Sequence, residues 1–145
     1  MFGEMVMKRY FLLLLILFSI NACSKKGEKF ELFSPESFAY SMDNGWELNA
    51  TVRARGFEQK ENNNKFSAKL SYYVNLQTPE GKPINKISSG IINKTENEKI
   101  PEIPIESQIK LDSSYKTGNY KITFYVKDEL TGKEISTENM FELSK

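Results

Sequence analysis

The residue types that perform most enzymatic chemistry are scarce in this chain of 145 residues, which contains one Cys and no His. This scarcity excludes Ser-His-Asp and Cys-His catalytic groups, histidine-containing zinc sites and CxxC pairs. Acidic pairs such as Glu96 with Glu98 fall in expected turns, where solvated carboxylates are usual. A glycosidase can use two carboxylates, but it also needs a shaped cleft. The sequence therefore predicts a protein that is not an enzyme and has no catalytic residues, cofactor or metal.

Hard oxygen ligands for calcium are present at Asp128, at Glu129 and in the Asp43-Asn44-Gly45 stretch, but no spaced Asp-x-Asp-x-Asp run accompanies them. We therefore interpret these groups as turn residues. Charge is balanced, with 20 Lys and Arg against 19 Asp and Glu over the whole chain. Such a balance argues against a nucleic-acid partner.

The single cysteine follows a distinctive leader. Lys8 and Arg9 precede an apolar run from Tyr10 to Ile20. That run is shorter than the roughly 20 residues that cross a bilayer as a helix. A basic start followed by a short apolar run is typical of a secretory signal peptide. Translation begins at Met1 or at Met7, which directly precedes the basic pair.

The end of this leader, Ile20-Asn21-Ala22-Cys23, resembles the bacterial lipobox, with Asn21 in place of the commoner Ala or Ser. The resemblance implies a lipoprotein that is cleaved between Ala22 and Cys23. Diacylglycerol would then modify the Cys23 sulfur, and an acyl chain such as palmitate its new amino group. Two or more acyl chains hold a protein stably on a membrane. Ser24 rather than Asp at the next position favours the outer membrane over the inner, by family analogy.

An ordinary secretory signal with a free Cys23 is the alternative, but an unpaired thiol is a liability in an exported protein unless it is consumed. We expect three segments: a signal peptide over 1–22, the lipidated cysteine and a polar tether over 23–29, and one domain over 30–145. The tether lacks bulky apolar groups. The remaining length suits a single core, and we expect a monomer.

Apolar and polar residues alternate with a period of two through most of this domain, which predicts half-buried strands. The expected strands cover 46–54, 66–76, 84–92, 105–111, 120–126 and 134–143. We expect the first two to pair as a long hairpin across the polar turn 61–64, and the last two to pair across 128–133. No amphipathic helix pattern follows Cys23. The expected fold is therefore an all-β antiparallel β-sandwich of about seven or eight strands.

The segment Leu111 to Ile122, with the sequence LDSSYKTGNYKI, resembles the approach to the penultimate strand of immunoglobulin-like and fibronectin-type domains. In those families a Gly-x-Tyr turn leads into an alternating strand, and the tyrosine hydroxyl bonds back to the preceding corner. The resemblance implies that Tyr120 is this tyrosine. It also implies an immunoglobulin-like sandwich, here without the cysteine pair of antibodies.

Two tyrosines are expected on strand faces that are otherwise polar. If Tyr72 and Tyr120 point inward, Tyr73 and Tyr125 point outward, and the resemblance places their strands side by side. Tyrosine rings present apolar area with a polar tip, which suits contact with a protein or a glycan. Alternatively, the two rings pack across the strands and only shield the sheet. The lysines expected around this binding patch are Lys69, Lys121 and Lys127.

Three other side chains have two interpretations each. Trp46 lies on the apolar face of its strand, where core packing is favoured over ligand stacking. Arg53 and Arg55 share the opposite face and are interpreted as solvated rather than as a binding site for an anionic partner.

Two functions from different classes remain. The leading hypothesis is a lipid-anchored lipoprotein of the cell envelope that binds an unknown protein or glycan. The alternative is a structural accessory subunit of an envelope assembly that faces the periplasm. Such a subunit could add a strand to a partner at the proline-bearing segment Ile100 to Ile105.

Overall fold

The computed structural model describes residues 27–145, which form eight β-strands and no helix. The strands are β1 (Glu31–Met42), β2 (Gly45–Arg55), β3 (Lys60–Asn62), β4 (Lys65–Gln77), β5 (Pro83–Glu96), β6 (Ile103–Asp112), β7 (Gly118–Asp128) and β8 (Glu134–Leu143). The expected signal peptide, its cleavage site, Cys23 and the start of the tether lie outside the described residues.

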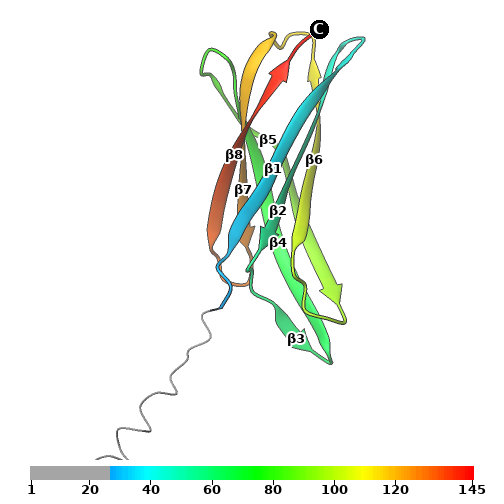
Figure 1. Cartoon of the computed structure of the whole chain (residues 1–145), viewed down its shortest axis with the longest axis vertical. Coiled ribbons are helices and arrows are strands. Elements are labelled where there is room, and N and C mark those ends of the chain that lie inside the picture. The colour runs from blue at the N-terminus through cyan, green and yellow to red at the C-terminus, as the bar shows by residue number, and fades with distance from the viewer. Residues whose placement is uncertain (1–26) are drawn as a thin grey trace, which may run out of the picture.

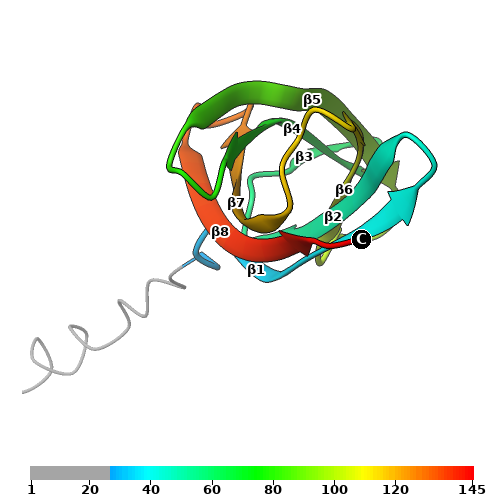
Figure 2. The same ribbon diagram turned by 90° about the horizontal axis from the view of Figure 1, so that it is seen from above.

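The strands form two antiparallel sheets (Figure 1). One sheet has the order β1-β2-β6. In the other, β3 and β7 pair with one side of β4, β5 pairs with its other side, and β8 pairs with β7. Both sheets curve around the core, so that β1 lies beside β8 at one seam (Figure 2). The prediction of an all-β antiparallel β-sandwich of about seven or eight strands is therefore confirmed.

The predicted hairpin between 46–54 and 66–76 is wrong. β2 pairs with β1 and β6, whereas β4 pairs with β3, β5 and β7, so these two strands lie in different sheets. The polar turn at 61–64 joins β4 to the short β3 instead. Alternation specifies which face of a strand is buried, but it does not specify the partner strand. The second expected hairpin is confirmed as β7 paired with β8.

The core lies between the two sheets and is built from the alternating residues that were expected to point inward. Trp46 is one of them, and its indole Nε1 donates a hydrogen bond to the Ser144 carbonyl oxygen at 2.8 Å. This confirms that Trp46 packs in the core. Fully burying a large apolar side chain contributes roughly 1.5–3 kcal/mol. The central buried side chains include Leu48, Val52, Leu70, Val74, Ile105, Leu111, Ile122 and Phe124.

Tyr120 forms the tyrosine corner that the family resemblance implied. Its side chain is 1% exposed, and its hydroxyl donates to the Lys116 carbonyl oxygen at 2.8 Å. Gly118 precedes it with φ of +137°, and a Cβ there would lie 2.9 Å from Pro79 Cγ. A side chain at position 118 is therefore strained for two reasons. The corner holds the chain where it passes from β6 in one sheet to β7 in the other.

Asp128 ties the other end of the sandwich together. Its buried carboxylate accepts hydrogen bonds from the Glu58 backbone N–H at 2.8 Å and from the Leu130 backbone N–H at 2.9 Å. Buried carboxylates need such partners, and this one joins the crossover before β3 to the β7–β8 turn. The turn between β1 and β2, which holds Asp43, lies at the opposite end of the molecule (Figure 1).

Removing the corner hydrogen bond should destabilise the domain without changing its fold. We expect Tyr120→Phe to lower the free energy of unfolding by about 1–2 kcal/mol, because it leaves a partly buried carbonyl without its donor. Urea denaturation followed by Trp46 fluorescence measures the change. Tyr115→Phe is the matched control, since its ring lies beside Tyr120 but its hydroxyl is not part of the corner. Equal losses in the two variants would contradict the role of the corner.

Candidate functional site

Tyr73 and Tyr125 lie directly opposite each other on the outer face of the five-stranded sheet, on β4 and β7. Their rings are stacked, with centroids 4.6 Å apart and planes 8° from parallel. The other two tyrosines of these strands point the other way: Tyr72 on β4 packs against the core, and Tyr120 on β7 is buried. The expected facing of all four tyrosines is therefore confirmed. A stacked pair of this kind stabilises a sheet by roughly 0.5–1.5 kcal/mol beyond its buried area.

The neighbouring strand β5 bulges beside this pair. β5 advances from Ile84 to Ser88 while β4 moves only from Val74 to Leu76, so β5 contains extra residues at this point. Lys86 lies in the bulge with φ of +51°, a backbone region that lysine rarely adopts. Bulges of this kind redirect side chains and often lie next to functional sites.

The bulge directs Lys86 onto the tyrosine pair. Its backbone N–H donates to Asn75 Oδ1 at 2.8 Å, which holds the strained conformation. Its Nζ lies 5.1 Å from the centroid of the Tyr73 ring, within the range of a cation–π interaction. Sequence reasoning missed Lys86, because strand alternation contains no signal for a bulge.

A shallow depression of about 460 Å³ lies next to Tyr73. Lys86, Lys127, Ile91 and Glu134 border it, and Ile91 is 64% exposed. Gly90 lies in its lining, and a Cβ there would come within 2.7 Å of the Tyr72 ring. We name the set of Tyr73, Tyr125, Lys86, Lys127 and Ile91 the tyrosine surface.

The three lysines expected around the pair have different positions. Lys127 borders the depression. Lys69 and Lys121 lie on the same outer face but four residues from Tyr73 and Tyr125 along their strands, or about 13 Å away. Lys121 is also ion-paired with Glu138 at 3.2 Å. The structure therefore brings Lys127 to the tyrosines and adds Lys86, while Lys69 and Lys121 lie further out.

The electrostatics of the tyrosine surface favour the neutral form of the Tyr73 phenol. Desolvation raises the pKa of Tyr73 above its usual 10.0, and the nearby charges of Glu134 and then Tyr125 raise it further. A neutral phenol donates and accepts hydrogen bonds. The arrangement offers aromatic and apolar area, two amines and one carboxylate, which is the chemistry of a contact surface.

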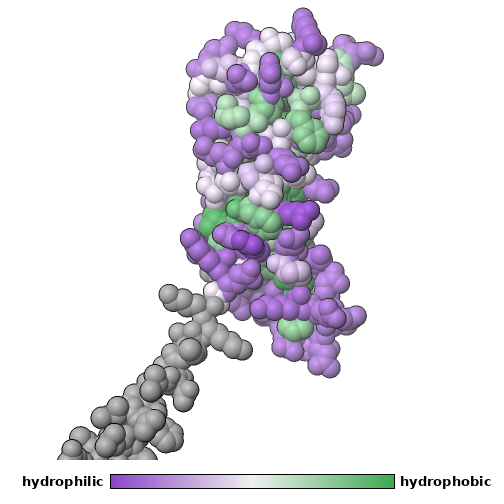
Figure 3. Space-filling model, in the orientation of Figure 1, coloured by the Kyte–Doolittle hydropathy of each residue, from purple (hydrophilic) through white to green (hydrophobic). Residues whose placement is uncertain are grey.

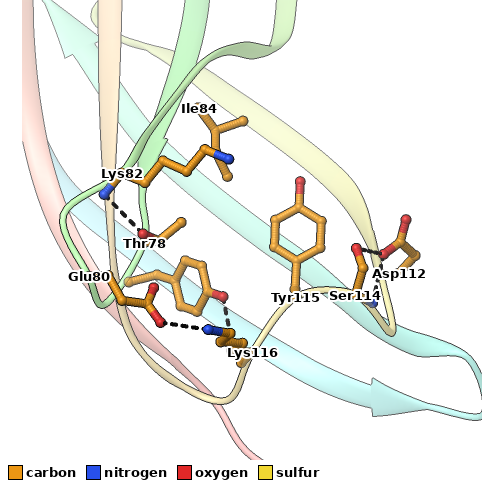
Figure 4. Close-up of a pocket in the computed structure, with 9 residues that line it drawn as sticks. Thr78, Glu80, Lys82, Ile84, Asp112, Ser114, Tyr115 and Lys116 are labelled. Atoms are coloured by element: carbon orange, nitrogen blue, oxygen red, sulfur yellow. Dashed lines mark hydrogen bonds and ion pairs between the residues drawn. The ribbon is translucent and has the colours of Figure 1, made fainter.

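A second concave region adjoins the tyrosine corner, between the β4–β5 and β6–β7 loops (Figure 4). This cleft has a volume of about 520 Å³. Both loops are closed by hydrogen bonds of their own: the Thr78 Oγ1 accepts from the Lys82 backbone N–H at 3.0 Å, and Asp112 Oδ1 accepts from the Ser114 backbone N–H at 2.9 Å. The Tyr115 ring stands between the two loops in Figure 4.

The carboxylates of this cleft are held in their ionised form. The pKa of Glu80 is lowered, first by its own backbone N–H and then by Lys116, whose Nζ lies 3.4 Å away. The hydroxyl and the backbone N–H of Ser114 lower the pKa of Asp112. Both shifts are opposite to the raised pKa that a glycosidase general acid requires. The sequence did not single out this cleft, because its residues come from two separate loops.

The two arginines of β2 form ion pairs within the domain. Arg53 pairs with Glu102 at 2.6 Å, and Arg55 pairs with Glu31. The arginines are therefore on the outer face, as expected, and each already has an anionic neighbour.

The segment Ile100 to Ile105, where a partner was expected to add a strand, is partly occupied by a side chain of this domain. Gln59 Nε2 donates to the Ile100 carbonyl oxygen at 2.9 Å, and Gln59 Oε1 accepts from the Ile100 backbone N–H at 2.8 Å. A side chain thus takes the place of an added strand at this residue. Ile103 and Ile105, further along the segment, are buried in the core.

Residues 27–145 contain no cluster of three or more His, Cys, Asp or Glu side chains that could hold a metal ion. Within the same range, no helix could span a bilayer.

Comparison with known proteins gives a likeness of fold alone. No protein-family model and no curated protein sequence matches this chain. Among solved structures, the chain is similar to a family 123 glycoside hydrolase from Clostridium perfringens that was studied for glycolipid glycan hydrolysis. The sequence identity is 14%, the TM-score is 0.49, and the match covers 74% of this chain and 22% of that chain. This chain thus corresponds to about a fifth of that enzyme, and a similarity at this level does not extend the enzyme's activity to it.

The pKa of Tyr73 should respond to Glu134. We expect it to exceed 10.0 in the folded protein and to fall in Glu134→Gln, because a nearby negative charge disfavours the phenolate. NMR titration of tyrosines labelled with ¹³C at Cζ measures both values. Since the folded-state pKa is raised, the associated stability is present below the unfolded pKa and is lost as the pH rises through the folded one. Glu138→Gln, whose carboxylate pairs with Lys121, is the control, and a shift of Tyr73 in that variant but not in Glu134→Gln would refute the assignment.

Proposed function

We propose that this chain is a lipid-anchored, non-enzymatic module of a bacterial cell envelope, and that it binds a protein or a glycan through the tyrosine surface. The observation that supports the binding role is the bulge at Lys86. A cross-strand tyrosine pair needs no bulge to shield a sheet, yet β5 adopts a rarely populated backbone conformation that places a lysine over one of the two rings. Strained residues persist where the surrounding structure holds them in place and are concentrated at functional sites.

The composition of the tyrosine surface also suits recognition. Aromatic side chains are enriched in binding interfaces, and a tyrosine loses little conformational entropy on binding. Lys86 and Lys127 form no ion pair among the described residues, so both amines are available to a ligand. Two small residues beside the rings, the half-exposed Ser71 and the exposed Ser89, leave room for a flat group.

The anchoring part of the proposal is supported by the leader and by the position of the chain entry. The lipobox-like Ile20 to Cys23 precedes a tether of a few polar residues. The described chain enters β1 at one end of the sandwich, and the C-terminus lies at the other (Figure 1). A lipid on Cys23 would thus leave both sheet faces accessible. We propose the outer membrane as the location.

Removing both rings should weaken binding strongly while preserving the fold. We expect the double variant Tyr73→Ser with Tyr125→Ser to reduce retention on its ligand about tenfold or more, because central aromatic residues contribute most to binding energy. The measurement is binding of the purified chain to a glycan array and to solubilised envelope components of its own cells, with circular dichroism to verify folding.

Two controls sharpen this experiment. Leu130→Ser changes an exposed apolar residue of the β7–β8 turn, outside the tyrosine surface, and should leave binding intact. Lys86→Met keeps the length of the side chain but removes its charge, and should weaken binding less than the double variant. A double variant that binds as well as the wild type would show that the tyrosines only shield the sheet.

Anchoring has a separate test. We expect Cys23→Ala to abolish the incorporation of labelled palmitate and to move the protein from the membrane fraction to the soluble fraction, because the thiol is the attachment point of the lipid. Sucrose-gradient fractionation should place the wild-type protein with outer-membrane markers. Membrane association that survives in Cys23→Ala would contradict a lipid anchor. It would not affect the proposal that the tyrosine surface binds a ligand.

A further inference from the structure

Large apolar side chains are exposed at the seam between β1 and β8. Phe38, Tyr40 and Met42 on β1 are 49%, 57% and 52% exposed, and Met140 on β8 is 57% exposed. Only Ile91 and Leu130 are exposed to a similar degree elsewhere in the described part of the chain. We name Phe38, Tyr40, Met42 and Met140 the β1–β8 apolar surface.

Three of these residues share one face of β1, and the fourth lies on the strand beside it. Phe38, Tyr40 and Met42 occupy alternate positions of one strand and so point to the same outer face. The rings of Phe38 and Tyr40 meet edge to face, with centroids 5.6 Å apart. The Ser37 hydroxyl donates to the Met140 carbonyl oxygen at 3.3 Å, which places Met140 beside the same stretch of β1. Figure 3, in the orientation that has β1 and β8 toward the viewer in Figure 1, shows apolar groups among hydrophilic ones on this face.

The rim of this surface is acidic. Glu36 and Glu142 flank it on β1 and β8, Asp43 follows Met42, and Glu47 lies opposite Tyr40 on β2. None of these four carboxylates forms an ion pair within the described residues. Elsewhere in the domain, Glu31, Glu80, Glu96, Glu102 and Glu138 are each paired with a lysine or arginine.

Few cations offset this rim. Lys121 lies opposite Met140 on β7, but it is ion-paired with Glu138 and so adds no net charge. The other cations are Lys110, opposite Glu47 on β6, and Lys145, after the end of β8. Four carboxylates against two amines leave an excess of negative charge around the apolar side chains.

We propose that the β1–β8 apolar surface docks a second protein, whose contact surface presents apolar side chains bordered by Lys or Arg. Aromatic residues and Met are enriched at the centres of protein interfaces, whereas contiguous exposed apolar groups are uncommon on monomers. Complementary charges at the rim of an interface direct association and exclude wrong partners. Phe38, Tyr40 and Met42 lie on the three-stranded sheet, whereas the tyrosine surface lies on the five-stranded one. Met140 shares the five-stranded sheet but is four residues along β8 from Ser136, the residue opposite Tyr125, or about 13 Å away.

The same charges disfavour two other occupants. A second copy of this chain in a symmetric pair would bring the acidic rim against itself. An anionic lipid surface would repel it as well. A partner with a basic rim is the occupant that both the apolar side chains and the carboxylates fit.

Site-specific photo-crosslinking in living cells tests this proposal on the full chain. Benzoylphenylalanine is placed at position 40 in one strain and at position 130, an exposed apolar site of the β7–β8 turn, in another. We expect a discrete protein adduct at position 40 and none at position 130. Mass spectrometry of the crosslinked peptide should find apolar residues accompanied by Lys or Arg. The experiment does not depend on the tyrosine surface or on Cys23.

Charge reversal provides the second arm. The change Glu36→Lys with Glu142→Lys should lower the crosslink yield at position 40 about fivefold or more, because it sets like charges against a basic rim. Glu98→Lys, an exposed reversal in the β5–β6 loop, should have no effect. Raised ionic strength should weaken binding of the identified partner to the purified wild type and have less effect on the reversed variant. An adduct with the mass of a homodimer, an adduct to lipid, a partner peptide without basic residues, or no adduct would each overturn the proposal.

Discussion

The crossing of the chain between the two sheets at the tyrosine corner governs the geometry of the sandwich. Tyr120 bonds back to the Lys116 carbonyl oxygen, and Gly118 allows the close approach of the chain to Pro79. Together they determine where β7 begins. Because side chains alternate along a strand, a shift of one residue in β7 would exchange its buried and exposed faces. The corner thus decides that Phe124 is buried and that Tyr125 faces outward against Tyr73.

The two surfaces for which we propose binding roles differ in physical character. The tyrosine surface is a stacked aromatic pair beside two amines, shaped by a strained bulge in β5. The β1–β8 apolar surface is a group of exposed apolar side chains inside an acidic rim. The β1 part of the second surface lies on the three-stranded sheet and the tyrosine surface on the five-stranded one, so one ligand need not exclude the other. A domain tethered at one end could in this way join two envelope components.

Sequence reasoning succeeded where the signal is local. The inward and outward facing of Trp46, Tyr72, Tyr73, Tyr120 and Tyr125 follows from alternation along single strands, and the tyrosine corner follows from a short motif. It failed where the outcome depends on partners distant in the chain. The predicted hairpin of 46–54 with 66–76 was wrong, because β2 pairs with β1 and β6 in the other sheet. The outlying positions of Lys69 and Lys121, by contrast, follow from the rise along a single strand, since each lies four residues from its tyrosine.

The amino-acid sequence by itself determined the all-β class, the faces of the main strands and the absence of His and of a cysteine pair, since these depend on composition and on neighbours along the chain. Only the tertiary structure decided which strands share a sheet, the bulge that brings Lys86 over Tyr73, and the approach of the Met140 backbone to Ser37 across the seam between β1 and β8. The physical reason is that these contacts join segments far apart in the sequence. These long-range contacts depend on how the whole core packs. Alternation within one strand does not specify that packing.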